Sequence, residues 1–180
     1  MVDINSSRVL TRADLDALPD DLLRHELIDG HFVMTPAPGV NHQTASLRLM
    51  ILLDAQVRGS ALMVLTAIFD VVLGPHVVKP DLIVAPKADF TERDLPVAPL
   101  LVVEVLTTST LHLDRGRKRE IYAEAGVLHY WIVDPDEPSI SVLELADGGY
   151  VEVGHAVGDQ TINIERPVAL HFAPADLLRD

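Results

Sequence analysis

The chain has 180 residues, of which 48% are hydrophobic, so it is long enough to close one sizeable core and short for two. We therefore expect a single domain over residues 1–180. The absence of cysteine excludes disulfides, thiolate zinc sites and a cysteine nucleophile. No segment approaches the roughly 20 consecutive apolar residues of a bilayer span, and the first residues lack a secretory pattern, which predicts a soluble, cytoplasmic protein.

The balance of charge is strongly negative, with 27 acidic and 14 basic side chains and a formal net charge of -13. This argues against broad nucleic-acid binding, because duplex binding depends on the neutralisation of phosphates by Lys and Arg. The basic residues are unevenly spread, however, and four of them lie within five positions: Arg115, Arg117, Lys118 and Arg119. The sequence thus allows a local positive patch beside an acidic remainder.

The chain begins with the pattern of a short helix followed by a hairpin. Thr11, with Asp14 three residues later, is typical of a capping box that opens a helix through Leu18. Asp29-Gly30 separates two short runs that contain apolar residues, within the segment 25–34. This predicts a β-hairpin, because both central residues of a type I′ turn need positive φ.

A long helix and a β-rich region are expected next. The helix extends from a cap at Asn41 to a stop at Gly59. Apolar runs broken by glycine and proline then predict strands at residues 61–66, 68–73, 77–85 and 100–106. Val102 and Val103 lie in a nearly continuous apolar run, which is typical of a strand buried on both faces at the centre of a sheet.

The last third of the chain is predicted to start with a second long helix, from about Leu113 to Ala125, which Gly126 ends. The elements expected after it are a strand at 130–133, hairpin strands at 140–145 and 150–153, and a short helix near 174–178.

Two carboxylates occupy apolar runs, where charge is least expected: Asp81 and Glu104. A buried, unpaired carboxylate costs several kcal/mol, so each needs a partner. A hard cation shared between the two would satisfy both. The alternatives are a salt bridge for each, or a position at a strand end in water.

The second long helix adds a candidate third group. Asp114, Lys118 and Tyr122 are spaced i, i+4, i+8 and so form one stripe, with neighbouring Cβ atoms roughly 5–6 Å apart. Ile121 and Ala125 adjoin this stripe, which favours its facing the sheet. An ordinary surface pair of Asp114 and Lys118 explains the same spacing.

Several segments, in order and spacing, resemble the Uma-two family of restriction endonucleases, which is assigned to the PD-(D/E)xK nuclease superfamily. The matching segments are His25 to Gly30, Pro36-Ala37-Pro38 with His42-Gln43, Pro80-Asp81-Leu82, Val103 to Leu106 with Ser109-Thr110, Asp114 through Lys118 to Val127, and Tyr130 to Pro135. The resemblance covers about residues 10–153. It implies an α/β restriction-endonuclease-like fold, with a mixed central β-sheet flanked by helices and additional β-hairpins.

The resemblance also implies roles for individual residues. Asp81 and Glu104 match the two acids of the motif. The superfamily places its lysine two residues after the second acid, where this chain has Leu106, and Lys118 on the following helix matches the position used in this family. The resemblance implies supporting roles for four further residues: Glu26, His42, Asp114 and Tyr122. A surface glutamate and a capping or core histidine are the alternatives for the first two.

The implied activity is metal-dependent hydrolysis of phosphodiesters in nucleic acid, with DNA as the expected substrate. Asp81, Glu104 and the Val105 backbone carbonyl are the expected ligands of Mg²⁺ or Mn²⁺. Residues expected to contact phosphates are Arg115, Arg117 and Arg119, unless they are solvated surface charges. We also expect a homodimer, because a symmetric pair readily cuts both strands of a duplex.

Two other functions fit the same sequence. A catalytically silent binding or assembly module fits the acidic charge and the displaced lysine. A metal-dependent hydrolase of a small nucleotide fits the shortage of basic surface.

Overall fold

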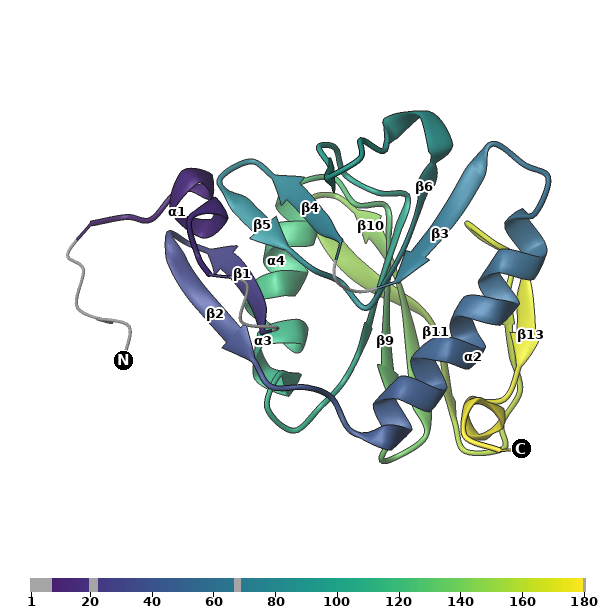
Figure 1. Cartoon of the computed structure of the whole chain (residues 1–180). Coiled ribbons are helices and arrows are strands. Elements are labelled where there is room, and N and C mark those ends of the chain that lie inside the picture. The colour runs from purple at the N-terminus through teal and green to yellow at the C-terminus, as the bar shows by residue number, and fades with distance from the viewer. Residues whose placement is uncertain (1–7, 20–22, 67–68, 180) are drawn as a thin grey trace.

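The computed structural model describes residues 8–19, 23–66 and 69–179. Its main feature is a sheet of six strands, in the order β11-β10-β9-β8-β6-β3 (Figure 1). These strands are β3 (Leu62–Thr66), β6 (Leu82–Pro86), β8 (Leu101–Val105), β9 (His129–Asp134), β10 (Ser139–Ala146) and β11 (Gly149–Val157). Neighbours are antiparallel except for β8 and β9, which are parallel.

A second sheet has five strands, in the order β2-β1-β5-β4-β7. They are β1 (Arg24–Ile28), β2 (His31–Thr35), β4 (Asp70–Leu73), β5 (His76–Val78) and β7 (Asp94–Leu95). The first two form the predicted hairpin, and the φ angles of Asp29 and Gly30 are 50° and 73°. The type of turn expected from the Asp-Gly pair is therefore confirmed.

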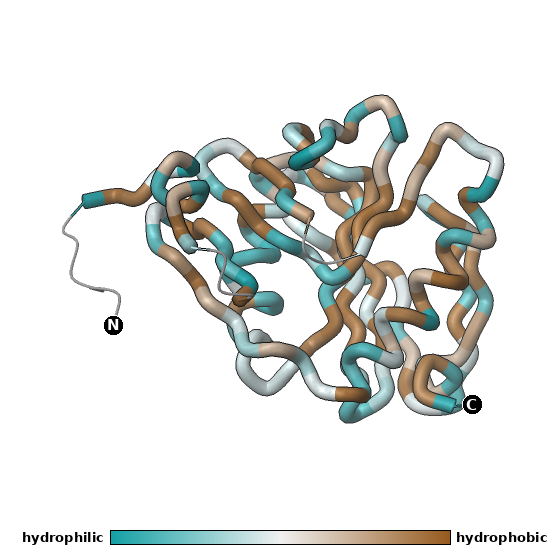
Figure 2. The backbone as a smooth tube through the Cα atoms, in the orientation of Figure 1, coloured by the Kyte–Doolittle hydropathy of each residue, from teal (hydrophilic) through white to brown (hydrophobic). Residues whose placement is uncertain are grey.

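The helices lie on both sides of the larger sheet, with α2 on one side and α3 and α4 on the other (Figure 1). The helices are α1 (Arg12–Asp16), α2 (Val40–Val57), α3 (Leu111–Arg115) and α4 (Arg117–Glu124), with 3-10 turns η1 (Lys87–Asp89) and η2 (Pro174–Leu177). A small sheet of β12 (Ile162–Ile164) and β13 (Leu170–Phe172) packs in the core on the α2 side. Figure 2 shows hydrophobic residues along the strands of the larger sheet and hydrophilic residues on much of α4.

The alternation of side chains along β8 decides which residues meet α4. Val103 and Val105 pack in the core cluster that contains α2, whereas Val102 packs in the cluster that contains Tyr122 of α4. Successive strand residues point to opposite faces, so Glu104 faces the same side as Val102. A charged residue in the middle of the sheet is thereby directed at α4.

The prediction of one strand over residues 77–85 is wrong. The segment forms two strands in different sheets, β5 ending at Val78 and β6 beginning at Leu82. Pro80 lies between them, and a proline cannot donate a hydrogen bond to a strand ladder. The chain passes here from one sheet to the other, which places Asp81 at their junction.

The prediction of one helix from Leu113 to Ala125 is also wrong, because α3 and α4 are separate helices divided at Gly116. A Cβ on Gly116 would lie 2.7 Å from the carbonyl oxygen of His112, so the backbone approaches too closely for a side chain. The expected cap at Asn41 is corrected as well: the cap of α2 is Gly39, and Asn41 lies inside the helix.

Other expected elements are present with small differences in their ends. The first helix is shorter than predicted and spans Arg12–Asp16. The strand predicted from residue 68 starts outside the described residues, and β4 begins at Asp70. Over the ranges that the structure covers, no helix has both the length and the apolar character needed to cross a membrane.

Replacement of Gly30 by alanine tests the hairpin turn. Gly30 has φ of 73°, and a Cβ there would lie 2.4 Å from Val9 Cγ1. We expect Gly30→Ala to lower the free energy of unfolding by about 1 kcal/mol or more, because alanine is strained at positive φ. Urea unfolding measures the difference. The control is Gly149→Ala, since a Cβ on Gly149 meets nothing within 4 Å; equal losses in both variants would contradict the expected strain.

Candidate active site

The two predicted acids lie side by side on neighbouring strands. Leu82 of β6 pairs with Val103 of β8, so Asp81, one residue earlier, stands opposite Glu104. The backbone N–H of Val105 donates to Asp81 Oδ2 over 2.8 Å. This contact fixes the carboxylate of Asp81 at the end of β8.

Lys118 lies at the centre of a cluster of carboxylates. Its Nζ is 3.1 Å from Glu104 Oε1, 3.1 Å from Glu26 Oε1 and 3.4 Å from Asp114 Oδ1. The side chains of these four residues are at most 2% exposed. The acids come from β1, β8 and α3, so one ammonium joins both sheets to the helical layer.

Further hydrogen bonds hold the cluster in place. The Tyr122 hydroxyl donates to Glu104 Oε1 over 2.6 Å, and the Tyr130 hydroxyl donates to the carbonyl oxygen of Asp114 over 2.8 Å. The backbone N–H of Lys79 donates to Glu26 Oε1 over 2.7 Å. The predicted supporting residues Glu26, Asp114 and Tyr122 therefore all contact the site.

His42 also reaches the site, from the first turn of α2. Its Nε2 is 3.2 Å from Asp81 Oδ2. Burial alone raises the pKa of Asp81, but the hydrogen bond to His42 and the charge of Arg24 outweigh it and hold that pKa below its usual range. Asp81 is therefore an ionised carboxylate over the whole neutral range.

The sequence prediction missed Arg24, which lies between the acids. Its Nη1 donates to Asp81 Oδ1 over 2.8 Å, and its Nη2 is 3.7 Å from Glu104 Oε2. Its Nε is 4.0 Å from Glu26 Oε2. The signal that could have found it is the strand period of two, which puts Arg24 and Glu26 on one face of β1.

Burial and the charges of neighbouring groups together shift the pKa values of Glu104 and Lys118. Burial is the main cause that raises the pKa of Glu104 to about 8. The nearby charges of Asp114 and Asp81 raise this pKa as well, whereas the Lys118 ammonium lowers it. Burial alone lowers the pKa of Lys118, but Glu104, Glu26 and Asp114 outweigh it and raise that pKa above its ordinary value. Lys118 is thus held in its charged form.

The donor set fits a hard divalent cation in its chemistry. The buried carboxyl groups offer oxygen, which Mg²⁺ and Mn²⁺ prefer, and Glu26 Oε2 and Asp114 Oδ1 are buried without a hydrogen-bond partner. In the part of the chain that the structure covers, no group of three or more His, Asp or Glu side chains is arranged so that it could hold a metal ion. The guanidinium of Arg24 lies where the oxygens of the acids face one another. The role predicted for the Val105 carbonyl stays a prediction.

The three arginines of residues 115–119 do not form one positive patch, which corrects that expectation. Arg115 is about half exposed and lies 3.9 Å from Asp134. The other two are bound to separate elements: Arg117 to Asp29 in the β1–β2 turn at 2.7 Å, and Arg119 to the Tyr150 carbonyl of β11 at 2.8 Å. Their predicted contact with phosphates stays a prediction.

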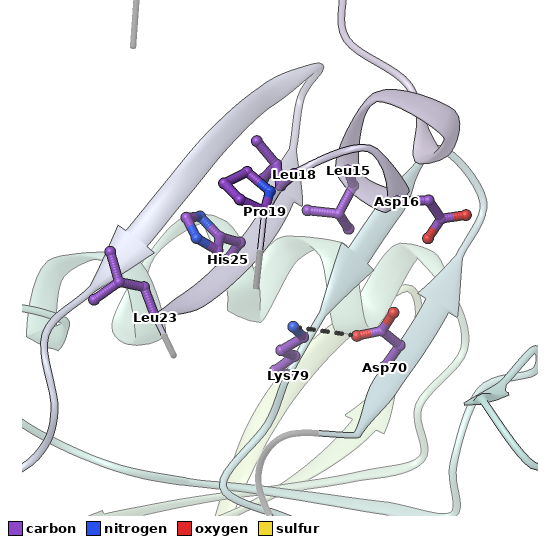
Figure 3. A pocket seen from close by; sticks show the side chains of 8 residues that line it. All are labelled: Leu15, Asp16, Leu18, Pro19, Leu23, His25, Asp70 and Lys79. Atoms are coloured by element: carbon purple, nitrogen blue, oxygen red, sulfur yellow. Dashed lines mark ion pairs between the residues drawn. The ribbon is translucent and has the colours of Figure 1, made fainter. Parts of the chain in front are cut away.

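Two cavities lie outside the acid cluster, and Asp81, Glu104 and Lys118 line neither of them. One, of about 210 Å³, lies beside α1 and β1, and Figure 3 shows Leu15 and His25 at its wall and the Lys79 ammonium directed at Asp70, 3.5 Å away. His25 follows Arg24 along β1 and faces away from the acids. The other cavity, of about 430 Å³, is lined by residues after Glu104, including Thr107, by three acids, Asp134, Asp136 and Glu137, and also by His112 and Arg115.

Comparison with known proteins agrees with this arrangement. The model of the Uma2 family, described as "Putative restriction endonuclease", matches residues 12–175. The chain belongs to this family. No protein of the curated set matches the sequence.

The fold of this Uma2 chain is similar to a solved structure from Anabaena variabilis, described as a "putative nuclease belonging to DUF820". The TM-score is 0.74 at 18% sequence identity, and the match covers 93% of this chain and 97% of that chain. At this identity the likeness shows the fold alone. The predicted fold, with a mixed sheet and flanking helices, is confirmed.

Lys118→Met tests the central position of the ammonium. Because the variant leaves buried acids without their shared cation, we expect the free energy of unfolding to fall by about 3–5 kcal/mol. Urea unfolding gives the value. Lys87→Met is the matched control, since Lys87 is exposed and its ammonium donates to the Ser60 carbonyl over 2.8 Å; it should change stability by about 0.5 kcal/mol or less. Similar losses in both variants would contradict the assigned position.

Proposed function

We propose that this Uma2 protein is a metal-dependent nuclease that hydrolyses phosphodiester bonds in nucleic acid, with DNA as the substrate. The observation that supports it is the convergence of Asp81, Glu104 and Lys118 in one buried cluster. Two acids and an amine are the groups that this hydrolysis requires, and the chain brings them together from three elements. The description of the family supports the same reaction class.

In this proposal Asp81 and Glu104 hold Mg²⁺ or Mn²⁺. The ion, when bound, would polarise the scissile phosphate and lower the pKa of a water molecule. Glu26 Oε2 is a further buried oxygen without a hydrogen-bond donor, and it faces the same space. His42 positions Asp81, and the backbone N–H of Val105 fixes the other side of that carboxylate.

Lys118 has the role of the displaced lysine. Its ammonium stands 3.1 Å from Glu104 Oε1, next to the place where the phosphate would react. A fixed positive charge there stabilises the negative charge that develops on the phosphate oxygens in the transition state. Asp114 and Glu26 keep the amine charged and oriented, so they act as positioning residues.

Asp81→Asn tests the metal-dependent reaction. The amide keeps the size of the side chain and removes the charge that a divalent ion needs, so we expect cleavage of duplex DNA with Mn²⁺ to fall by more than about 100-fold. Gel assays of plasmid nicking measure it, and chelation of the metal should stop the wild-type reaction.

The matched control is Asp159→Asn, whose carboxylate is 75% exposed and binds Arg179. This variant should cut at the wild-type rate. If the wild type shows no metal-dependent cleavage, and manganese binds with no difference between wild type and Asp81→Asn, the binding or assembly module is the better reading.

The choice of substrate separates the nuclease from a hydrolase of small nucleotides. We expect the wild type to cut polynucleotides at least about tenfold faster than dinucleotides or nucleoside diphosphates, because flanking phosphates add binding energy that raises the rate at the reacting bond. Matched assays at equal phosphodiester concentration, resolved by chromatography, give the ratio. Faster turnover of the small substrates would favour the small-nucleotide hydrolase. The homodimer expected from the sequence belongs to this proposal as well, since it pairs two such sites on one duplex.

A further inference from the structure

The guanidinium of Arg24 lies among the oxygens that the proposed metal ion needs. It contacts the carboxylates of Asp81, Glu104 and Glu26 through its three different nitrogens, at 2.8, 3.7 and 4.0 Å. These oxygens, Asp81 Oδ1, Glu104 Oε2 and Glu26 Oε2, differ from the ones that Lys118 and His42 contact. Each acid thus turns one oxygen to a fixed partner and the other to Arg24.

The fit of the guanidinium to this place is incomplete. The Nη1 contact to Asp81 is short enough for a hydrogen bond, whereas the contacts to Glu104 and Glu26 are too long. Arg24 Nε and Glu26 Oε2 are both buried without a hydrogen-bond partner. The guanidinium leaves Glu26 Oε2 unsatisfied and donates from its Nη2 to the Lys79 carbonyl oxygen instead, while a compact divalent ion binds several oxygens at once.

Arg24 also lies on the solvent side of the cluster. Its side chain is 20% exposed, against 3% for Asp81, 1% for Glu104 and 0% for Glu26. A metal ion or a phosphate that reaches the acids from that side has to pass the guanidinium. Arg24 is the first residue of β1, and its Nη2 also donates to the Lys79 carbonyl oxygen, so a turn of the side chain away from the acids has to break that bond as well as the one to Asp81.

We infer that Arg24 is an internal cation that competes with the metal ion for the site, sets its affinity for divalent ions and is displaced when one binds. This inference rests on the proposed function, because it requires a divalent ion at Asp81 and Glu104. It adds to the site a residue, Arg24, that determines when a divalent ion binds there. The single charge of Arg24 offsets part of the repulsion between the acids in the metal-free protein, and a divalent ion replaces it.

Calorimetric titration of the full chain with Mn²⁺ tests the competition. Arg24→Gln removes the charge and keeps a polar, shorter side chain, so we expect manganese to bind at least about tenfold more tightly than in the wild type. Arg24→Lys keeps the charge and should stay within about threefold of the wild type. Arg117→Gln is the matched control, because Arg117 also pairs with carboxylates but on the surface, and its affinity should equal that of the wild type.

The outcomes separate this inference from the proposed function. The inference is supported if Arg24→Gln binds Mn²⁺ more tightly than the wild type and the double variant with Asp81→Asn does not bind it. This holds also when the wild type itself binds Mn²⁺ too weakly to measure. Equal or weaker binding by Arg24→Gln overturns the inference and leaves the metal site intact. No binding by either protein overturns both.

A measurement on the wild type covers the case in which Arg24→Gln does not fold. Phenylglyoxal modifies exposed arginines, and mass spectrometry of the digested protein reports the modification of the peptide that holds Arg24. Saturating Mn²⁺ should raise the rate at Arg24 several-fold and leave the rate at Arg117 unchanged. An unchanged rate at Arg24 under saturating Mn²⁺ would mean that the ion binds without displacing it, and the inference would be wrong.

Discussion

The buried ammonium of Lys118 is the interaction on which the rest of the site depends. It is 1% exposed and touches acids from β1, β8 and α3. A lone buried charge is very costly, so the ammonium and its acids must be buried together or not at all. This requirement fixes the five-stranded sheet, the six-stranded sheet and the helical layer relative to one another at a single point.

The buried charges serve a binding site better than they serve the stability of the fold. The four acids of the cluster, which are Glu26, Asp81, Glu104 and Asp114, stand against the two permanent charges of Arg24 and Lys118. Replacing such a network by apolar groups often stabilises a protein, so the network is weak grounds for stability and better grounds for a binding site. Burial is the main cause that raises the pKa of Glu104 to about 8, and the charges of Asp114 and Asp81 add to it. A divalent ion is the partner that would offset the excess of negative charge.

The sequence predicted the parts of the site that depend on local pattern. Asp81 and Glu104 stood out because acids are rare in apolar runs. Helical spacing made Lys118 only a candidate, beside an ordinary surface pair with Asp114, and the resemblance to the family gave it its role. Arg24 was missed because its importance depends on which sheet β1 joins, and this is a long-range property. Pro80 was a local signal that residues 77–85 form two strands, because a proline cannot donate a hydrogen bond to a strand ladder. The sequence allowed a local positive patch, but it could not show that arginines so close in sequence point to different elements of the fold.

The acidic charge of the chain limits how a phosphate could be attracted. Arg117 and Arg119 are bound to other elements, and the cavity beyond Glu104 is lined by three acids together with His112 and Arg115, which lies 3.9 Å from Asp134. In the proposed function, a divalent ion at Asp81 and Glu104 would add positive charge that attracts a phosphodiester. In the proposed exchange the ion also releases Arg24, whose planar guanidinium suits bidentate contact with a phosphate. Under that inference, Arg24 would be paired with the acids while the metal is absent and would be free to contact a phosphate once the metal is bound.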